Sequence, residues 1–154
     1  GDAMDKDLFV QQVDQHSGMM YRVALTILRN DEDCKDALQE AALKAWAKRH
    51  SLRDRAFFAT WMTRIVINEC HDILRKRKRQ VPMEQLPERA APEQDLSLYL
   101  TLDSLPDKYR LPLVLRYSEG MTEEQIAKAL GLSAAAVRGR LYRGRQRLKK
   151  ELEG

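Results

Sequence analysis

Three prolines, Pro82, Pro87 and Pro92, separate two blocks of helical sequence in this chain. Because proline lacks a backbone N–H and fixes φ, no regular helix continues through all three. Apolar residues in both blocks recur with the helical period, and no segment alternates as a strand does. The sequence therefore predicts an all-α fold with two small helical domains joined by a flexible linker. We expect the domains over residues 4–79 and 94–154, with the linker over 80–93.

The first block predicts three helices. Asn30 followed by Asp31 is typical of a helix end and a new N-cap. The polar residues 50–56 show no period, which predicts a loop. We therefore expect helices over 5–29 and 31–49, and a third from Phe57 to Arg79. The side chains that this third helix is expected to bury are Phe58, Trp61, Ile65, Ile73 and Leu74.

The second block contains the pattern of a helix-turn-helix. Thr122, with Gln125 three residues later, fits a capping box at a helix start. Gly131 is suited to a left-handed turn, and Ser133 is suited to cap the helix that follows. The helices expected in this block span 94–104, 107–118, 122–130 and 133–152.

Basic residues gather at the ends of two helices. The formal net charge is +4, but residues 75–79 are all basic, and residues 133–150 hold seven basic residues and no acidic one. Residues 80–104, between these clusters, hold five acidic residues and one basic one. Two basic clusters at helix ends indicate a polyanion and favour nucleic acid. The alternative is that they are solvated helix ends, where cations are favourable without any partner.

The second helix of the helix-turn-helix is expected to enter the DNA major groove. Arg138, near its N-terminal end, is the better candidate for contacts to base edges, whereas Arg143 and Arg145 are expected to contact phosphates. The alternative is an αα-hairpin with a purely structural role. The DNA-contacting side chains predicted for this helix are Arg138, Arg140, Tyr142, Arg143 and Arg145.

One face of the helix over 31–49 mixes acids, an amide and a leucine. It consists of Asp36, Gln39, Glu40 and Leu43. Because carboxylates are repelled by DNA, this face fits a protein partner better than a nucleic acid. The alternative is a solvated face with one incidental leucine.

The long helix from Phe57 has a cationic, hydrogen-bonding stripe. Its members, spaced by four, three and four residues, are Arg64, Asn68, His71 and Arg75. Such a stripe suits a nucleic-acid strand, and Phe57, Phe58 and Trp61 beside it could stack on bases. The alternative, favoured for Phe58 and Trp61, is that these aromatics belong to the core.

Catalysis, cofactor binding and membrane insertion find no support in the sequence. Adjacent Cys70 and His71 point about 100° apart on a helix and make a poor joint site, and Cys34 and Cys70 fit inert core thiols. No carboxylate cluster, phosphate loop or nucleophile–base pair is recognisable, and no apolar run is long enough to span a membrane. No signal peptide precedes the first helix. We therefore expect a cytoplasmic protein that is not an enzyme and binds no cofactor or metal.

Both blocks resemble a known family. Two stretches resemble region 2 of bacterial sigma factors of the extracytoplasmic-function (ECF) group. They are Asp36-x-x-Gln39-Glu40-x-x-Leu43-Lys44-Ala45-Trp46 and the stretch from Phe58 to Asn68. Region 4 of these proteins is similar to Leu115-Arg116-Tyr117-x-x-Gly120-Met121-Thr122-x-x-Gln125-Ile126-Ala127. It also resembles Val137-Arg138-Gly139-Arg140-Leu141-x-Arg143-Gly144-Arg145.

The resemblance implies a transcription initiation factor that binds RNA polymerase core enzyme and directs it to promoter DNA. In such proteins region 2 docks on the clamp helices of the largest polymerase subunit, and Asp36, Gln39, Glu40 and Leu43 match the docking positions. Region 2 also opens the −10 element, with Asn68 at the strand-opening position and the 51–60 loop placed to hold a flipped base. The stripe of Arg64, Asn68, His71 and Arg75 then contacts −10 DNA, and region 4 reads the −35 element.

The resemblance also implies an anti-sigma factor as a partner. Two departures from the family bear on DNA preference: Gly139 stands where serine is frequent, and Ala136 stands where threonine is common. An autonomous helix-turn-helix regulator that binds an operator without polymerase is the alternative function. Such a regulator would not need the outer face at 36–43.

Overall fold

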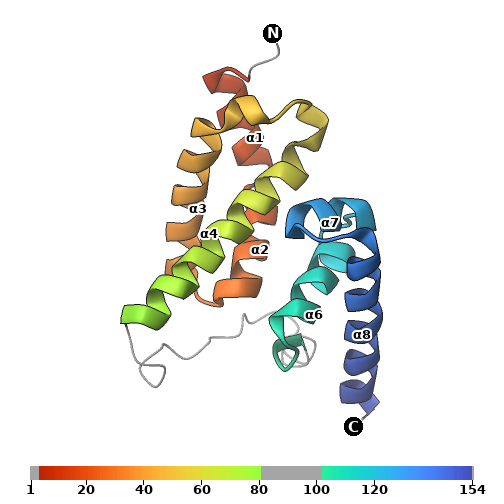
Figure 1. The fold of residues 1–154 in the computed structure, drawn as a ribbon. Coiled ribbons are helices and arrows are strands. Elements are labelled where there is room, and N and C mark those ends of the chain that lie inside the picture. Colours follow the sequence, from red (N-terminus) through yellow and green to blue (C-terminus); the bar gives the residue numbers. More distant parts are fainter. Residues whose placement is uncertain (1–3, 81–101, 154) are drawn as a thin grey trace. The chain divides into compact units, whose positions relative to one another are not determined.

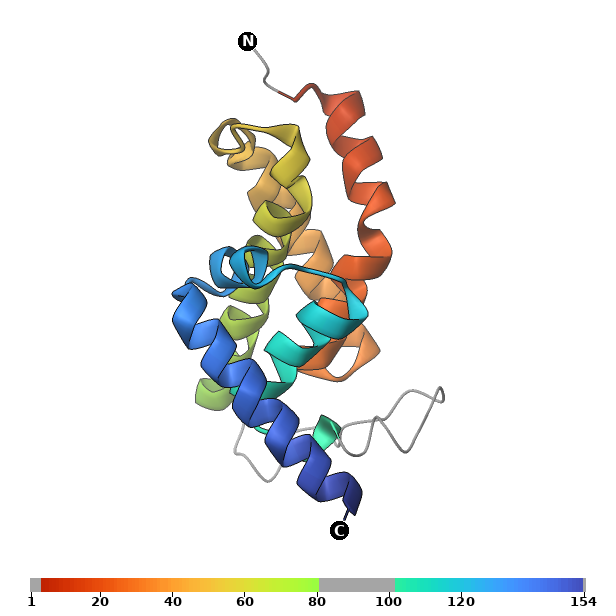
Figure 2. The same ribbon diagram turned by 90° about the vertical axis from the view of Figure 1, so that its right-hand side faces the viewer.

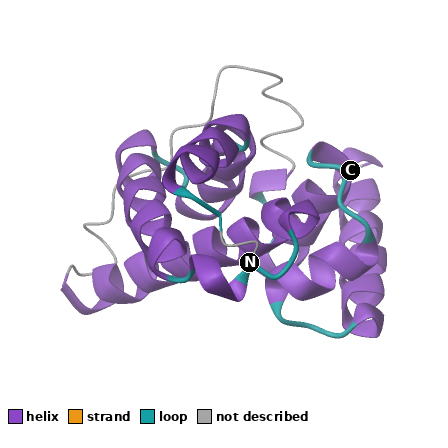
Figure 3. Ribbon diagram, turned by 90° about the horizontal axis from the view of Figure 1, so that it is seen from above, coloured by secondary structure: helices purple, strands orange, loops and turns teal. Residues whose placement is uncertain are grey.

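The computed structural model describes residues 4–80 and 102–153, which contain helices and loops and no strand (Figure 3). The chain separates into two compact units, residues 1–87 and 88–154. The prediction of an all-α chain with two helical domains is confirmed. The predicted linker over 80–93 lies outside the described residues apart from Gln80, and so does most of the predicted helix over 94–104.

Residues 4–80 of the N-terminal unit form four α-helices and two short 3-10 turns. In Figure 1, α4 lies beside α2 and α3, and these three helices pack against one another. The elements are α1 (Lys6–Gln15), α2 (Ser17–Leu28), α3 (Asp31–Ala47), η1 (Arg49–Ser51), η2 (Arg55–Phe57) and α4 (Phe58–Gln80). The predicted cap of α3 is confirmed, because the Asn30 side chain accepts a hydrogen bond of 2.8 Å from the backbone N–H of Asp33.

The prediction of one helix over 5–29 is wrong, because the chain breaks into α1 and α2 at His16. The Ser17 hydroxyl donates to the carbonyl oxygen of Asp14, and the His16 ring lies 2.8 Å from the carbonyl oxygen of Gln12. Side-chain contacts to nearby carbonyls compete with the helical ladder, which explains the break.

The core of the N-terminal unit contains Phe58 and Ile65, as predicted for α4. Trp61, Ile73 and Leu74 are only half-buried, so this part of the prediction is wrong. Ile73 and Leu74 lie towards the C-terminal end of α4, beyond Cys70, where none of residues 71–79 is fully buried. The indole N–H of Trp61 donates to the hydroxyl of Ser51 over 3.0 Å, which places its polar edge near the surface.

The C-terminal unit contains the predicted helix-turn-helix. The elements of its described residues, 102–153, include α6 (Asp107–Leu113), the π-helix η4 (Val114–Ser118), α7 (Glu123–Leu130) and α8 (Ala134–Glu153). The capping box of Thr122 and Gln125 forms, and Gly131 takes a φ of 68° in the turn. Helix α8 packs against α6 and α7 (Figure 2). Buried Gly144 allows a close approach to α6, because a Cβ at this position would lie 3.1 Å from Leu113 Cδ1.

The predicted helix over 107–118 is correct in position but is not one regular α-helix. From Val114 onward the backbone forms a wider turn, in which the N–H of Glu119 donates to the carbonyl oxygen of Val114 over 3.1 Å. A π-turn adds one residue to a helical turn, and five residues of sequence cannot distinguish it from an α-turn by periodicity.

Candidate functional site

Helix α3 presents the predicted partner face to solvent. Leu43 is 66% exposed, and Asp36, Gln39 and Glu40 are also exposed. The opposite side of α3 is fully buried and consists mostly of small residues: Cys34, Ala37, Ala41 and Ala45. Small buried side chains let α3 lie close to its neighbours, so the fold of this helix does not depend on the face around Leu43.

Lys44 connects this helix to α4 through an ion pair. Its ammonium lies 2.5 Å from a carboxylate oxygen of Glu69, whose side chain is only 6% exposed, and 3.7 Å from Asp72. The hydrogen bond to Glu69, more than any other contact, raises the pKa of Lys44. The carboxylate of Glu69 is therefore buried with its countercharge in place.

A polar pocket of about 340 Å³ lies beside this ion pair, between α3 and α4. Three of the four residues predicted for the nucleic-acid stripe line it, namely Asn68, His71 and Arg75. Arg64 is exposed on α4 and is not among the lining residues. The complete lining is Lys44, Lys48, Ile65, Asn68, Glu69, His71, Asp72 and Arg75.

The charges in this pocket are partly paired with one another. Arg75 contacts the carboxylate of Asp72 within α4, while Lys44 contacts Glu69 and Asp72 from α3. The sequence pattern did not indicate Lys44 of α3 or Lys48, the residue that follows α3, because neither lies on the helix that carries the stripe. The pocket offers cations for phosphates and the amide of Asn68 for a base edge.

The three aromatics at the start of α4 have different environments. Phe58 is 1% exposed and packs against Trp61 with ring centroids 5.7 Å apart and ring planes tilted by 49°, so it belongs to the core. Phe57, by contrast, is 51% exposed at the end of η2, where the Asp54 side chain accepts a hydrogen bond from the N–H of Ala56. Of these rings, Phe57 is the one whose exposure suits base stacking.

The five basic residues 75–79 differ in how far their side chains are exposed. Arg77 forms an ion pair with Asp33, and both side chains are mostly buried. This ion pair joins the end of α4 to the start of α3, where the amide of Asn30 also donates to Asp33 over 2.6 Å. Arg77 therefore fits neither interpretation of the run, because it is paired and mostly buried, while Lys76, Lys78 and Arg79 are exposed.

The predicted DNA-contacting side chains of α8 lie on two flanks of the helix. On one flank, Arg138 is 59% exposed and lies 3.6 Å from Glu123 at the start of α7. On the same flank, about two helical turns later, Arg145 donates a hydrogen bond of 2.9 Å to the phenol oxygen of Tyr117. Tyr142 and Arg143 are exposed, whereas Arg140 is half-buried.

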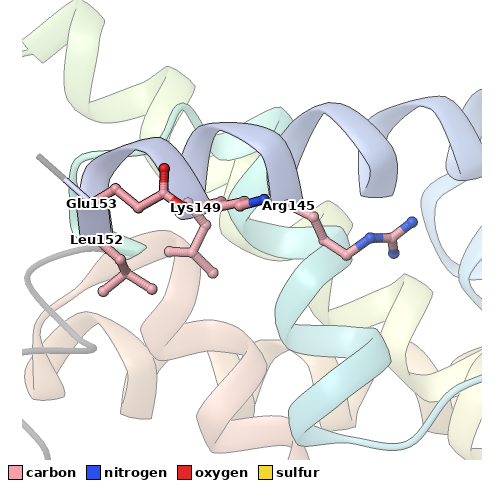
Figure 4. Close-up of a pocket in the computed structure, with 5 residues that line it drawn as sticks. Arg145, Lys149, Leu152 and Glu153 are labelled. Atoms are coloured by element: carbon pink, nitrogen blue, oxygen red, sulfur yellow. The ribbon is translucent and has the colours of Figure 1, made fainter.

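A shallow groove of about 380 Å³ follows the C-terminal half of α8 and begins at Arg145 (Figure 4). Leu152 and Glu153 lie at its other end, with Lys149 between them and Arg145. The remaining lining residue is Leu148.

Comparison with known proteins decides which class of DNA-binding protein this is. Residues 12–80 match the family Sigma-70 region 2, and residues 95–148 match the family Sigma-70, region 4. The ECF RNA polymerase sigma factor SigW of Bacillus subtilis is 29% identical, over 96% of this chain and 90% of its own length. The RNA polymerase sigma-E factor of Streptomyces coelicolor is 33% identical, over 94% of this chain and 85% of its own length.

This chain is an ECF RNA polymerase sigma factor. Proteins of this family are transcription initiation factors that direct polymerase to promoters. An autonomous regulator is not favoured, because a simple repressor needs no region 2 and the match to region 2 runs through α2, α3 and α4.

Two solved structures resemble this sigma factor over nearly its whole length. The sigma factor RpoE of Bartonella quintana, solved with the anti-sigma factor NepR, gives a TM-score of 0.83 at 25% identity, covering 97% of this chain and 98% of that chain. CnrH, solved with the cytosolic domain of CnrY, gives a TM-score of 0.71 at 25% identity, covering 97% and 90%.

The thiols of this sigma factor are buried in region 2. Cys34 and Cys70 are both fully buried, and burial raises the pKa of both thiols, that of Cys34 to about 12. Within residues 4–80 and 102–153, no group of three or more His, Cys, Asp or Glu side chains is arranged to hold a metal ion. No helix in these ranges is long and apolar enough to cross a membrane.

Proposed function

We propose that this sigma factor divides its work between its two units. Residues 4–79 bind polymerase core enzyme and open the −10 element, residues 94–154 read the −35 element, and residues 80–93 link them. Each role is a binding role, so the protein needs no catalytic group, cofactor or metal of its own. Because promoter DNA and polymerase are its partners, it acts in the bacterial cytoplasm.

The polymerase contact is assigned to Asp36, Gln39, Glu40 and Leu43. The observation that supports it is the exposed leucine among polar side chains, on a helix whose opposite side is fully buried. An apolar side chain that loses its water on binding, surrounded by a rim of polar side chains, is typical of a protein interface. The family resemblance gives the clamp helices of the largest subunit as the partner surface.

The −10 contact is assigned to the pocket between α3 and α4. Asn68 supplies both a donor and an acceptor there, which is what a base edge requires once its own pairing partner is lost. Arg75 and His71, with Arg64 outside the pocket, are assigned to the strand backbone. Extruding a base costs a few kcal/mol, and a pocket that holds the extruded base offsets that cost.

Asn68→Ala is the experiment that tests this assignment. The variant holoenzyme should still bind double-stranded promoter DNA but open it poorly, as measured by permanganate reactivity of unpaired thymines. A template with mismatches across the −10 element should restore opening, because the unpairing cost has then been removed. Equal defects on paired and mismatched templates would instead assign Asn68 a structural role.

The −35 contact is assigned to α8, through Arg138, Arg140, Tyr142, Arg143 and Arg145. Glu123 and Tyr117 lie against Arg138 and Arg145, which restricts the conformations of these two arginines before DNA arrives. Restricting them in advance reduces the entropy lost on binding.

An anti-sigma factor is proposed as the regulatory partner. The sigma factor RpoE of Bartonella quintana was solved with the anti-sigma factor NepR, and CnrH was solved with the cytosolic domain of CnrY. A protein that buries Leu43 on α3 would compete with polymerase for the same surface.

A further inference from the structure

Three cations surround the ring of Tyr109 on α6. The ring is buried, and the Cβ of Tyr109 would lie 3.3 Å from a Cβ at Gly144, so packing against α8 fixes its position. The Lys108 ammonium lies 5.1 Å from the ring centroid, and the guanidinium carbon of Arg147 lies 4.8 Å from it. Burial opposes ionisation of this phenol, but the cation of Lys108, a hydrogen bond from Arg143 and the cation of Arg147 lower the pKa of its hydroxyl. One fixed phenol therefore gathers cations from both helices.

The charges of these three cations are not balanced by acidic side chains. Within the described part of the C-terminal unit, none of the three forms an ion pair with a carboxylate. Asp107, which precedes Lys108 in the sequence, contacts Arg110 instead. Arg143 and Arg147 are four residues apart on α8, where like charges repel one another. The cluster is therefore a local excess of positive charge, which a bound anion would stabilise.

The chemistry of the cluster suits a phosphate of a nucleic-acid backbone. Guanidinium and ammonium groups donate several charge-assisted hydrogen bonds, and a phosphate has oxygens to accept them from more than one direction. The three cationic side chains are exposed, whereas Tyr109 is only 5% exposed, so the cluster presents charge and almost no apolar area. A protein interface has an apolar core, which this surface lacks. A DNA backbone, by contrast, is bound mainly through neutralisation of its phosphates.

We propose that Lys108 and Arg147 together hold one backbone phosphate of the promoter DNA beside the −35 element. The inference rests on the proposed function of α8 and extends it to α6, because Lys108 lies outside the helix-turn-helix. Arg147 follows Arg143 by about one helical turn on the same face of α8, so the phosphate lies beside the part of α8 assigned to DNA. Tyr109 is the positioning residue, since its ring contacts both cations. A phosphate contact carries no base information but fixes how the helix sits on the duplex.

Promoter fragments that carry a single methylphosphonate test this contact, because a methylphosphonate removes the charge of one phosphate. The substitution is moved through the phosphates around the −35 element, and the affinity of each fragment is measured for holoenzyme with the wild-type chain and with the double variant Lys108→Gln, Arg147→Gln. At one position, neutralising the phosphate should weaken wild-type binding by roughly fivefold at physiological salt. The double variant should show no loss at that position, because the contact is already absent, and should keep the losses at the other positions.

On unmodified promoters the double variant should bind all −35 sequences about equally more weakly, and its salt slope should fall by about one unit. Lys149→Gln is the matched control, since Lys149 is exposed on the same helix but points about 200° away from Arg147. The control should leave the salt slope and the methylphosphonate pattern unchanged. A variant that only destabilises the unit would lose affinity by the same factor on every fragment, which separates a structural role from a phosphate contact.

The outcomes separate the inference from the function on which it rests. If wild-type holoenzyme selects −35 sequences but the double variant keeps the wild-type methylphosphonate pattern, the inference is wrong and the proposed function stands. Weaker binding of the double variant to core enzyme without DNA would assign the cluster to a protein partner and would also overturn the inference. If wild-type holoenzyme shows no −35 preference at all, the proposed role of α8 fails, and the inference fails with it.

Discussion

Replacing Lys44 with methionine should destabilise region 2 far more than an ordinary surface substitution does. The change keeps most of the apolar stem but removes the ammonium that lies 2.5 Å from Glu69. Because the Glu69 side chain is only 6% exposed, its carboxylate would be left in the protein without its closest countercharge.

The magnitude follows from how this pair is buried. Removing one partner of a fully buried ion pair costs about 3–5 kcal/mol. The Lys44 side chain is 40% exposed, so solvent screens part of the interaction, and we discount the loss to about 1–3 kcal/mol. For a unit of this size, 2 kcal/mol corresponds to a fall in melting temperature of roughly 8–16 °C.

Tryptophan fluorescence measures this loss in the full-length chain. Both tryptophans, Trp46 and Trp61, lie in the N-terminal unit, so their emission reports the unfolding of that unit alone. The matched control is Lys35→Met on the same helix, because Lys35 pairs with Asp31 at 3.1 Å but both side chains are well exposed. This control should leave the unfolding midpoint unchanged.

The pH dependence gives a second check on the same pair. The pKa of Lys44 is raised above its ordinary value of 10.5, so its contribution is complete below pH 10.5 and is lost as pH rises through the folded-state pKa. The difference between wild type and Lys44→Met should therefore stay constant from pH 7 to pH 10. Equal midpoints for Lys44→Met and Lys35→Met would refute the assignment of a buried, stabilising pair.

Three further predictions concern the surface and the core. Gln39→Ala with Leu43→Ala should weaken binding to core enzyme while costing under about 1 kcal/mol of stability; a large fall in melting temperature would place them in the core. Arg138→Ala should cost about 1–3 kcal/mol on the preferred −35 sequence, and Arg145→Ala should weaken all sequences alike and lower the salt slope by about one unit. Equal losses on every sequence for the first variant would contradict base reading. Burial raises the pKa of both thiols, that of Cys34 to about 12, so Cys34 and Cys70 of the native protein should resist thiol reagents at pH 8. Labelling of either thiol at a rate faster than global unfolding would contradict this prediction.

Features that depend on residues within one helical turn were predictable from the sequence. The cap at Asn30, the capping box of Thr122 and Gln125, and the left-handed turn at Gly131 all formed as expected. The exposure of Leu43 follows from the same logic, because the apolar stripe of α3 lies on the opposite side. In each case the chemistry of nearby residues determines the structure.

Features that join distant residues were not predictable in this way. Lys44 and Glu69 are 25 residues apart, and only the packing of α3 on α4 brings them together beside Asn68. The same packing buries Arg77 against Asp33, although its neighbours in the basic run are exposed. A run of identical charge gives no signal that one member faces inward.

Run-off transcription with core polymerase tests the central claim most directly. Core enzyme is incubated with and without this sigma factor on a library of promoter sequences, and the 5′ ends of the transcripts are sequenced. The account predicts transcripts that require the sigma factor and start at a fixed distance downstream of a shared −35 and −10 pair. Identical transcripts from core enzyme alone, or DNA binding by the chain without any initiation, would contradict it.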